Sequence, residues 1–318
     1  MTYTVLIIGF IFLIKGADLL VDGASSVARK FNISNLVIGL TIVAFGTSAP
    51  ELFVNIYASI QGTTDIAIGN IIGSNIVNML FILGVAAVIY PLTVTKGTVW
   101  KEIPLSLLAA LLVFLMANDI LFDGMNANIL TRIDGLVLIA FFIIFLYYTF
   151  GIAKTQGNTA PSEEIVMHSA WKSSGMILLG LVGLVLGGHW IVGSATTIAV
   201  SLGLSQALIG LTIVAIGTSL PELATSAVAA YKKNSDIAVG NVVGSNIFNI
   251  FWILGLSATI NPLPFSSILN FDVLVAIGAA LILFAIMFIW KRHTIGRREG
   301  IMLIVLYIIY TVIIVMRG

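Results

Sequence analysis

The sequence predicts an all-α integral membrane protein with ten transmembrane helices, arranged as two inverted five-helix repeats. Three observations lead to this fold class. Of the 318 residues, 59% are hydrophobic and 9% are charged, whereas soluble domains carry about 25% charged residues. Apolar runs of roughly 20 residues recur along the whole chain, which is the length of a membrane-spanning helix. Two long motifs also occur twice at one fixed spacing.

The apolar runs are long enough to cross about 30 Å of hydrocarbon as helices. The first run lacks a basic n-region and a small-residue cleavage site, so we interpret it as a true span rather than a signal peptide. The predicted spans are residues 3–21, 36–60, 66–90, 104–122, 131–150, 173–200, 207–231, 237–260, 269–290 and 298–316.

The basic residues divide between the two sides that ten spans create. Apart from Lys15 within the first span, the connections on one side hold only Arg132 and Arg317. The connections after odd-numbered spans hold all the others: Arg29, Lys30, Lys96, Lys101, Lys154, Lys172, Lys232, Lys233, Lys291, Arg292, Arg297 and Arg298. Because cytoplasmic loops are enriched in Lys and Arg, we expect a multi-pass protein of the cell (plasma) membrane with both termini extracellular.

Two motifs return at an offset of 171 residues. IGLTIVAFGTSAPE (38–51) returns as IGLTIVAIGTSLPE (209–222), and DIAIGNIIGSNIVN (65–78) returns as DIAVGNVVGSNIFN (236–249). A unit of five spans is odd, so the second copy must enter the membrane from the opposite side. Inverted repeats of this kind are typical of secondary transporters, with the substrate site near mid-membrane.

The repeat divides the chain into three parts. Residues 1–150 form the first five-helix repeat, and residues 173–318 form the second, inverted one. Residues 151–172 contain the polar stretch TQGNTAPSEE, whose composition predicts a flexible cytoplasmic linker. It is too short to be a separate folded domain.

Each repeat carries a proline in the middle of its second span. Pro50 and Pro221 lack the amide proton that would bond four residues back, which predicts a broken helix with carbonyl groups around 44–47 and 215–218 free to face a ligand. Glu51 and Glu222 follow directly, where a charge costs about 2.5–3.5 kcal/mol. One interpretation is that both bind a cation. The alternative is that each is neutral and bonds to nearby backbone.

Spans three and eight add polar side chains on one helical face. Asn70, Ser74 and Asn78 lie four residues apart, and the same pattern repeats at 241, 245 and 249. Ser74, Asn78, Ser245 and Asn249 are predicted ligands, whereas Asn70 and Asn241 are interpreted as joining helices. Carboxylate, hydroxyl, amide and carbonyl oxygens suit hard cations such as Ca²⁺ and Na⁺, and not zinc or copper.

Several function classes are disfavoured. A net charge of +1 offers no basic field for nucleic acid. Without cysteine, thiolate metal sites and cysteine catalysis are excluded. An intramembrane hydrolase with Ser48 or Ser219 as nucleophile lacks a His or Lys base nearby in the sequence. The expected partners are therefore ions and the lipid bilayer. No obligatory protein partner is inferred, and the sequence is compatible with a monomer.

At these motifs the sequence resembles the cation/calcium exchanger superfamily, specifically prokaryotic sodium/calcium exchangers. The GTSxPE and GNxxGSNxxN blocks are similar to the family's alpha-1 and alpha-2 repeats. The resemblance implies electrogenic exchange of one Ca²⁺ for three Na⁺ by alternating access, without enzymatic activity or a cofactor. A Ca²⁺/H⁺ exchanger of the same superfamily is the alternative. Some relatives, including the potassium-dependent branch, carry Asp at the position of Asn249, so K⁺ co-transport is not expected.

The resemblance also implies roles for individual residues. Glu51 and Glu222 would bind Ca²⁺ with main-chain oxygens of Thr47 and Thr218. Asn78 and Asn249 would complete the centre. The flanking Na⁺ sites would use two matched sets: Ala44, Thr47, Ser48, Ser74 and Glu51, and Ala215, Thr218, Ser219, Ser245 and Glu222.

Overall fold

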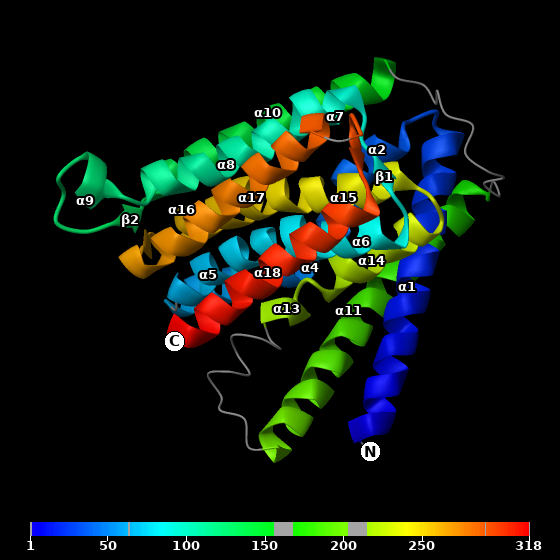
Figure 1. Cartoon of the computed structure of the whole chain (residues 1–318), viewed down its shortest axis with the longest axis horizontal. Helices are drawn as coiled ribbons and strands as arrows, with labels where there is room; N and C mark the ends of the chain where they lie inside the picture. Colours follow the sequence, from blue (N-terminus) through cyan, green and yellow to red (C-terminus); the bar gives the residue numbers. More distant parts are fainter. Residues whose placement is uncertain (1, 63, 156–167, 203–214, 290, 318) are drawn as a thin grey trace.

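The computed structural model describes residues 2–62, 64–155, 168–202, 215–289 and 291–317. The described chain is almost entirely helical, and only four two-residue strands interrupt it. The long helices α1 (Thr2–Lys30) and α11 (Ala170–Ser201) lie side by side and extend at an angle from the other helices (Figure 1).

The remaining elements follow the order of the predicted spans. Their bounds are α2 (Asn35–Ile38), η1 (Gly39–Val43), α3 (Ala44–Thr47), α4 (Ala49–Gln61), α5 (Thr64–Ile76), η2 (Val77–Ile82), α6 (Leu83–Ile89), β1 (Leu92–Thr93), α7 (Lys96–Trp100), α8 (Glu102–Met116), α9 (Asp119–Phe122), β2 (Ile129–Leu130), α10 (Arg132–Thr155), α13 (Ala215–Gly217), α14 (Leu220–Tyr231), α15 (Ser235–Ile247), η4 (Phe248–Leu254), α16 (Gly255–Ile260), β3 (Leu263–Pro264), η5 (Ser267–Leu269), α17 (Asn270–Ile289), β4 (Thr294–Ile295) and α18 (Arg297–Arg317).

The described ranges contain eight helices that are long and apolar enough to cross a membrane. They become nine if the bent pair of 35–47 and 49–61 is one span. The predicted seventh span, 207–231, falls partly on 203–214, outside the described residues. A multi-pass membrane protein is therefore evident, while the count of ten stays a prediction.

Two predicted spans have different bounds in the structure. Helix α1 continues to Lys30 instead of ending at residue 21, because its polar second half is paired: Asp18 and Asp22 both form ion pairs with Lys232. The fourth span runs over 96–116 and not 104–122. Its end is set by Asn118, whose Nδ2 donates to the carbonyl of Phe114 at 2.7 Å.

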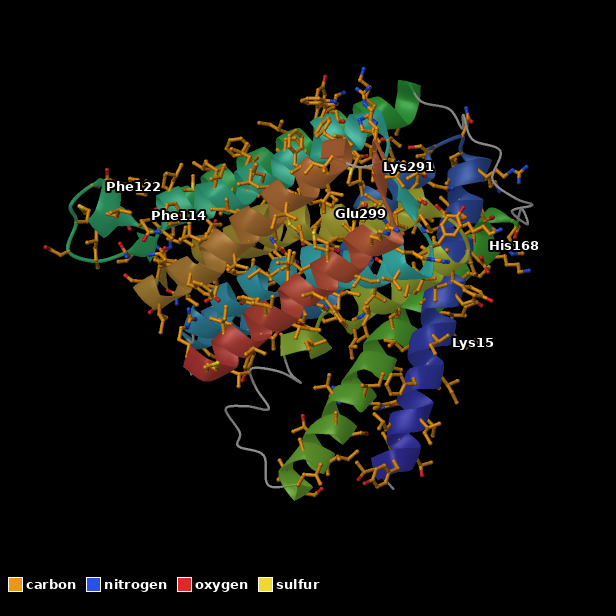
Figure 2. The ribbon with its side chains drawn as sticks, viewed as in Figure 1. Lys15, Phe114, Phe122, His168, Lys291 and Glu299 are labelled. Atoms are coloured by element: carbon orange, nitrogen blue, oxygen red, sulfur yellow. The ribbon has the colours of Figure 1, made fainter. Side chains whose placement is uncertain are left out.

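Short helix α9 folds back beside the end of α8. The rings of Phe114 and Phe122 meet edge to face with centroids 6.0 Å apart. Figure 2 shows this pair at one end of the helical bundle, with Lys291 and His168 toward the other end. The aromatic contact holds the apolar residues 120–122 against the end of α8 after the break at Asn118.

Helices α1 and α11 pack through glycines that are related by the repeat. A Cβ on Gly16 would lie 2.8 Å from the carbonyl oxygen of Gly180, and a Cβ on Gly187 would lie 2.7 Å from that of Gly9. The contacts run in opposite directions along the two helices, so the pair is antiparallel. Gly180 and Gly187 are the counterparts of Gly9 and Gly16 at the offset of 171. Gly16 therefore contacts the counterpart of Gly9, and Gly9 contacts the counterpart of Gly16.

The two strand pairs connect the first half of the chain with the second. Strand β1 pairs with β4, and β2 pairs with β3, both antiparallel. The pairs lie at opposite ends of the bundle (Figure 1). The two sequence repeats are therefore interlocked in space and do not form two separate domains.

The most buried helices carry the repeated motifs. Nearly all of the apolar part of 235–260 is buried, as is most of 67–89. Helix α15 packs tightly on the second span because a Cβ on Gly244 would lie 2.9 Å from the carbonyl oxygen of Leu40. This close approach brings the GNxxGSNxxN block of one repeat against the GTSxPE block of the other.

Candidate cation site

The predicted helix breaks are confirmed. Ser48 has φ −82° and ψ 9° between α3 and α4, and the helical segments 35–47 and 49–61 meet there at a bend of 48°. Ser219 has φ −89° and ψ 7° immediately before α14. Pro50 and Pro221 lie in the first turns of α4 and α14, where a missing amide proton costs no helical hydrogen bond. Each proline thus starts a new half-helix inside the membrane segment.

Glu51 and Glu222 occupy the first turns of these half-helices and are completely buried. A helix N-terminus carries partial positive charge, which favours a carboxylate there. The helix dipole compensates only a fraction of the negative charge of a carboxylate. Two buried carboxylates in one region therefore still require positive charge or protons.

Serine hydroxyls join each carboxylate to the opposite repeat. Ser48 Oγ donates to Glu222 Oε1 at 2.9 Å, and the counterpart Ser219 Oγ donates to Glu51 Oε1 at 3.3 Å. Within each repeat, Ser74 Oγ reaches Glu51 Oε1 at 3.3 Å, and Ser245 Oγ reaches Glu222 Oε1 at 3.5 Å. The structure therefore brings both carboxylates and all four predicted serines into one cluster.

The threonines of the two breaks bond across the repeats. Thr47 Oγ1 donates to Asn241 Oδ1 at 3.0 Å, and Thr218 Oγ1 donates to Asn70 Oδ1 at 3.3 Å. Asn70 and Asn241, interpreted from the sequence as joining helices, thus hold the hydroxyls that border the site. The matching contacts agree with the offset of 171 residues.

The carbonyl of Ala44 is not free, contrary to the prediction. It accepts hydrogen bonds from Ser48 N at 3.0 Å and Thr47 Oγ1 at 3.3 Å. The reason is local, because a threonine in a helix often bonds back to the carbonyl three or four residues earlier. For Ala215 only the backbone is described, and it begins α13.

Among the described residues, four buried oxygens of this cluster find no hydrogen-bond donor: Glu51 Oε2, Glu222 Oε2, Asn78 Oδ1 and Asn249 Oδ1. They form two pairs related by the repeat. An unsatisfied buried polar atom costs about 1–3 kcal/mol, and all four atoms are pure acceptors. Such a set is complementary to a hard cation, which prefers carboxylate and carbonyl-type oxygens.

Asn75 and Asn246 also lie at the site, and they were not among the predicted ligands. Asn249 Nδ2 donates to Asn75 Oδ1 at 2.9 Å, and Asn78 Nδ2 donates to Asn246 Oδ1 at 3.0 Å. The sequence contained a signal for them, since each of these asparagines is the last residue of a GSN triplet that occurs in both repeats.

The backbone that carries Asn78 and Asn249 is also unusual. Both residues are second in π-helical segments, η2 and η4. Single π-turns are rare and occur frequently at functional sites. Nothing in the local sequence indicates this widened turn, which shifts the side chains that follow it.

Comparisons with known proteins agree with this geometry. The family model described as "Sodium/calcium exchanger protein" matches residues 1–151 and 172–316. The putative antiporter CaxA of Alkalimonas amylolytica is 38% identical over 317 residues, covering 96% of this chain and 95% of its own. The sodium/calcium exchanger MaX1 of Methanosarcina acetivorans is 34% identical over 344 residues, covering 98% of each.

A solved structure is similar over nearly the whole fold. The sodium-calcium exchanger NCX_Mj, soaked without Na⁺ and Ca²⁺, is 36% identical with a TM-score of 0.82, and the match covers 97% of each chain. The same exchanger soaked with 2.5 mM Na⁺ and 0.1 mM Ca²⁺ gives a TM-score of 0.80. The chain therefore belongs to the sodium/calcium exchanger family of the cation/calcium exchanger superfamily and is a multi-pass membrane antiporter.

Proposed function

We propose that this protein exchanges Na⁺ for Ca²⁺ across the cell membrane by alternating access, with three Na⁺ for one Ca²⁺. The observation that carries the proposal is the group of four buried oxygens for which the described residues supply no donor, two of them from carboxylates. The proposed ligands are Glu51, Glu222, Thr47, Thr218, Ser48, Ser219, Ser74, Ser245, Asn78, Asn249, Ala44 and Ala215.

Charge and ligand number support Ca²⁺ as one substrate. Glu51 and Glu222 together supply two negative charges, which one divalent cation neutralises. Ca²⁺ takes 6–8 oxygen ligands. Two bidentate carboxylates with the main-chain oxygens of Thr47 and Thr218 provide six. Three Na⁺ at the same carboxylates would carry one charge more than Ca²⁺, so an exchange of three for one is electrogenic.

The threonine contacts suggest how Na⁺ could use Ala44. The single hydroxyl proton of Thr47 is shared between Ala44 O and Asn241 Oδ1. If Na⁺ binds the Ala44 carbonyl, this proton can remain on Asn241 without breaking the contact between repeats. Ala44 O would then keep its hydrogen bond from Ser48 N and exchange only the one from Thr47 Oγ1 for Na⁺.

The fold supports an inverted arrangement of the two repeats. The glycine contacts between α1 and α11 occur twice, with the roles of the two repeats interchanged. The two strand pairs at opposite ends of the bundle are related in the same way. We propose ten spans with both termini extracellular and the linker 151–172 cytoplasmic. Two equivalent halves around one site then provide the two states that alternating access needs.

The proposal is tested by ⁴⁵Ca²⁺ uptake into vesicles that contain the purified protein. An outward Na⁺ gradient with pH clamped should drive uptake, and the uptake should respond to membrane potential. A Ca²⁺/H⁺ exchanger is the second candidate, because a buried carboxylate can bind a proton in place of Na⁺. Uptake that follows a pH gradient and ignores Na⁺ would reject Na⁺ coupling.

A further inference from the structure

Asn75, Asn78, Asn246 and Asn249 form a hydrogen-bonded group between the two repeats, here called the amide belt. All four are at least 98% buried. Asn75 lies near the end of α5 and is followed three residues later by Asn78 in η2. In the same way, Asn246 lies near the end of α15 and is followed by Asn249 in η4. The belt therefore joins the two motif helices at the level of the cation site.

The belt is anchored on two main-chain carbonyls. Asn75 Nδ2 donates to Asn246 O at 3.2 Å, and Asn246 Nδ2 donates to Asn75 O at 3.4 Å. A carbonyl oxygen can only accept a hydrogen bond. The amide nitrogens of Asn75 and Asn246 must therefore face each other's backbone, and their Oδ1 atoms must face the opposite way.

This orientation determines the orientation of the other two amides. Asn75 Oδ1 accepts from Asn249 Nδ2 at 2.9 Å, and Asn246 Oδ1 accepts from Asn78 Nδ2 at 3.0 Å. An oxygen in this place requires a nitrogen opposite it. The remaining Oδ1 atoms of Asn78 and Asn249 then point away from the belt, and both are buried without a donor from the part of the chain that the structure describes.

We infer that Asn75 and Asn246 are positioning residues for cation selectivity, because they hold the amide oxygens of Asn78 and Asn249, and not the amide nitrogens, toward the cation. A flipped amide would present N–H groups with partial positive charge to the same place and repel a cation. This inference rests on the cation site of the proposed function. It adds two residues that act through the ligands without touching the ion.

The two positioning residues differ in how strongly each one fixes the amide orientation of its partner. Asn249 Nδ2 also donates to Ser74 Oγ at 3.2 Å, so its amide keeps one anchor if Asn75 is lost. The Nδ2 of Asn78 is held, among the described residues, by the single hydrogen bond to Asn246. Replacing Asn246 should therefore disturb cation binding more than replacing Asn75.

Equilibrium ⁴⁵Ca²⁺ binding to the purified, full-length protein tests the inference. In Asn246→Leu and in the smaller variant Asn246→Ser, the half-saturating Ca²⁺ concentration should rise about tenfold, the upper end of what one net hydrogen bond between neutral groups contributes. Asn75→Leu should raise it less. The matched control is Asn118→Leu, which removes a buried amide pair with Asn270 away from the site and should leave Ca²⁺ binding unchanged.

A rescue separates positioning from a structural role. A carboxylate presents an oxygen in either orientation, so Asn246→Leu should no longer lower Ca²⁺ affinity when it is made in an Asn78→Asp background. Unchanged half-saturation in the Asn246 variants, or no rescue by Asn78→Asp, would overturn the inference. It is also overturned if both Asn246 variants fail to fold while Asn118→Leu folds. Failure of the proposed function looks different, because the wild-type protein itself would then bind no Ca²⁺ or show no Na⁺-driven uptake.

Discussion

Ser48 donates a hydrogen bond of 2.9 Å to Oε1 of Glu222, which belongs to the other repeat. The reciprocal bond runs from Ser219 to Glu51 at 3.3 Å. Each helix break therefore supports the carboxylate of its counterpart. Because neither half contains a complete set of contacts, any cation bound here interacts with both repeats, which couples binding to their relative position.

The carboxylates themselves give the strongest predicted effect. Glu51→Gln and Glu222→Gln keep the side-chain volume and remove one of the two negative charges that face a divalent cation. Each variant should lower Na⁺-driven ⁴⁵Ca²⁺ uptake about 100-fold or more, which corresponds to about 2.8 kcal/mol. Reconstituted vesicles with equal protein content provide the measurement.

Glu299→Gln is the control for this experiment. Glu299 is a buried carboxylate in the first turn of α18, outside the cation site. Its variant should transport at the wild-type rate. Near-normal uptake in either the Glu51 or the Glu222 variant would contradict a site shared by both carboxylates.

Asn249→Asp should change which cations compete for the site. The substitution replaces the amide of Asn249, whose Oδ1 has no donor among the described residues, with a carboxylate and raises the local negative charge from two to three. A third charge favours additional or more highly charged cations, so inhibition of ⁴⁵Ca²⁺ uptake by external Na⁺, K⁺ and protons should shift relative to wild type. An identical inhibition series would show that Asn249 does not border the transported ion.

Gly16→Ala should destabilise the protein. A Cβ at this position would meet the Gly180 carbonyl at 2.8 Å and the Leu184 amide at 2.8 Å, and backbone atoms cannot move aside without separating α1 from α11. Overpacking of this kind costs about 1–3 kcal/mol. We expect a lower melting temperature in detergent, measured by fluorescence-detected size exclusion after heating.

The matched control is Gly175→Ala on α11. Beyond its chain neighbours and the backbone of its own helix, no described atom lies within 4 Å of a Cβ built on Gly175, so alanine adds helix propensity of about 1 kcal/mol without a clash. This variant should melt at or above the wild-type temperature. Equal melting of the Gly16 variant and wild type would mean that the two helices are not held at this distance.

The sidedness can be tested by cysteine labelling, since the chain has no cysteine of its own. Asp123 and Lys291 are both exposed and lie in connections that the distribution of basic residues assigns to opposite sides. In intact cells, a membrane-impermeant maleimide should label Asp123→Cys and leave Lys291→Cys unlabelled until the membrane is opened. The reverse pattern would invert the proposed topology.

Much of the site was predictable because its residues occur twice. The offset of 171 residues identified Glu51 with Glu222 and Ser74 with Ser245, and the structure brings all four into one cluster. The free carbonyl predicted at Ala44 was wrong for this arrangement, because the neighbouring Thr47 hydroxyl reaches it. A proline in the sequence shows that one backbone N–H is missing from the helix. It does not show whether a side chain donates to the neighbouring carbonyl groups instead.

Other features depend on contacts between distant parts of the chain. The exit of α1 at Lys30, beyond its apolar run, follows from the ion pairs of Asp18 and Asp22 with Lys232. A hydropathy pattern ends where the apolar residues end and contains no information about partners 210 residues away.

The sequence by itself determined that this chain is a membrane protein, that a unit was duplicated, and that two acids stand beside broken helices in the apolar segments. These properties are carried by composition, spacing and the chemistry of proline, which need no neighbours. Only the tertiary structure decided the orientation of the side-chain amides that join the two repeats. That choice depends on hydrogen bonds between Asn75 and Asn246, and such bonds exist only after the two repeats have packed together.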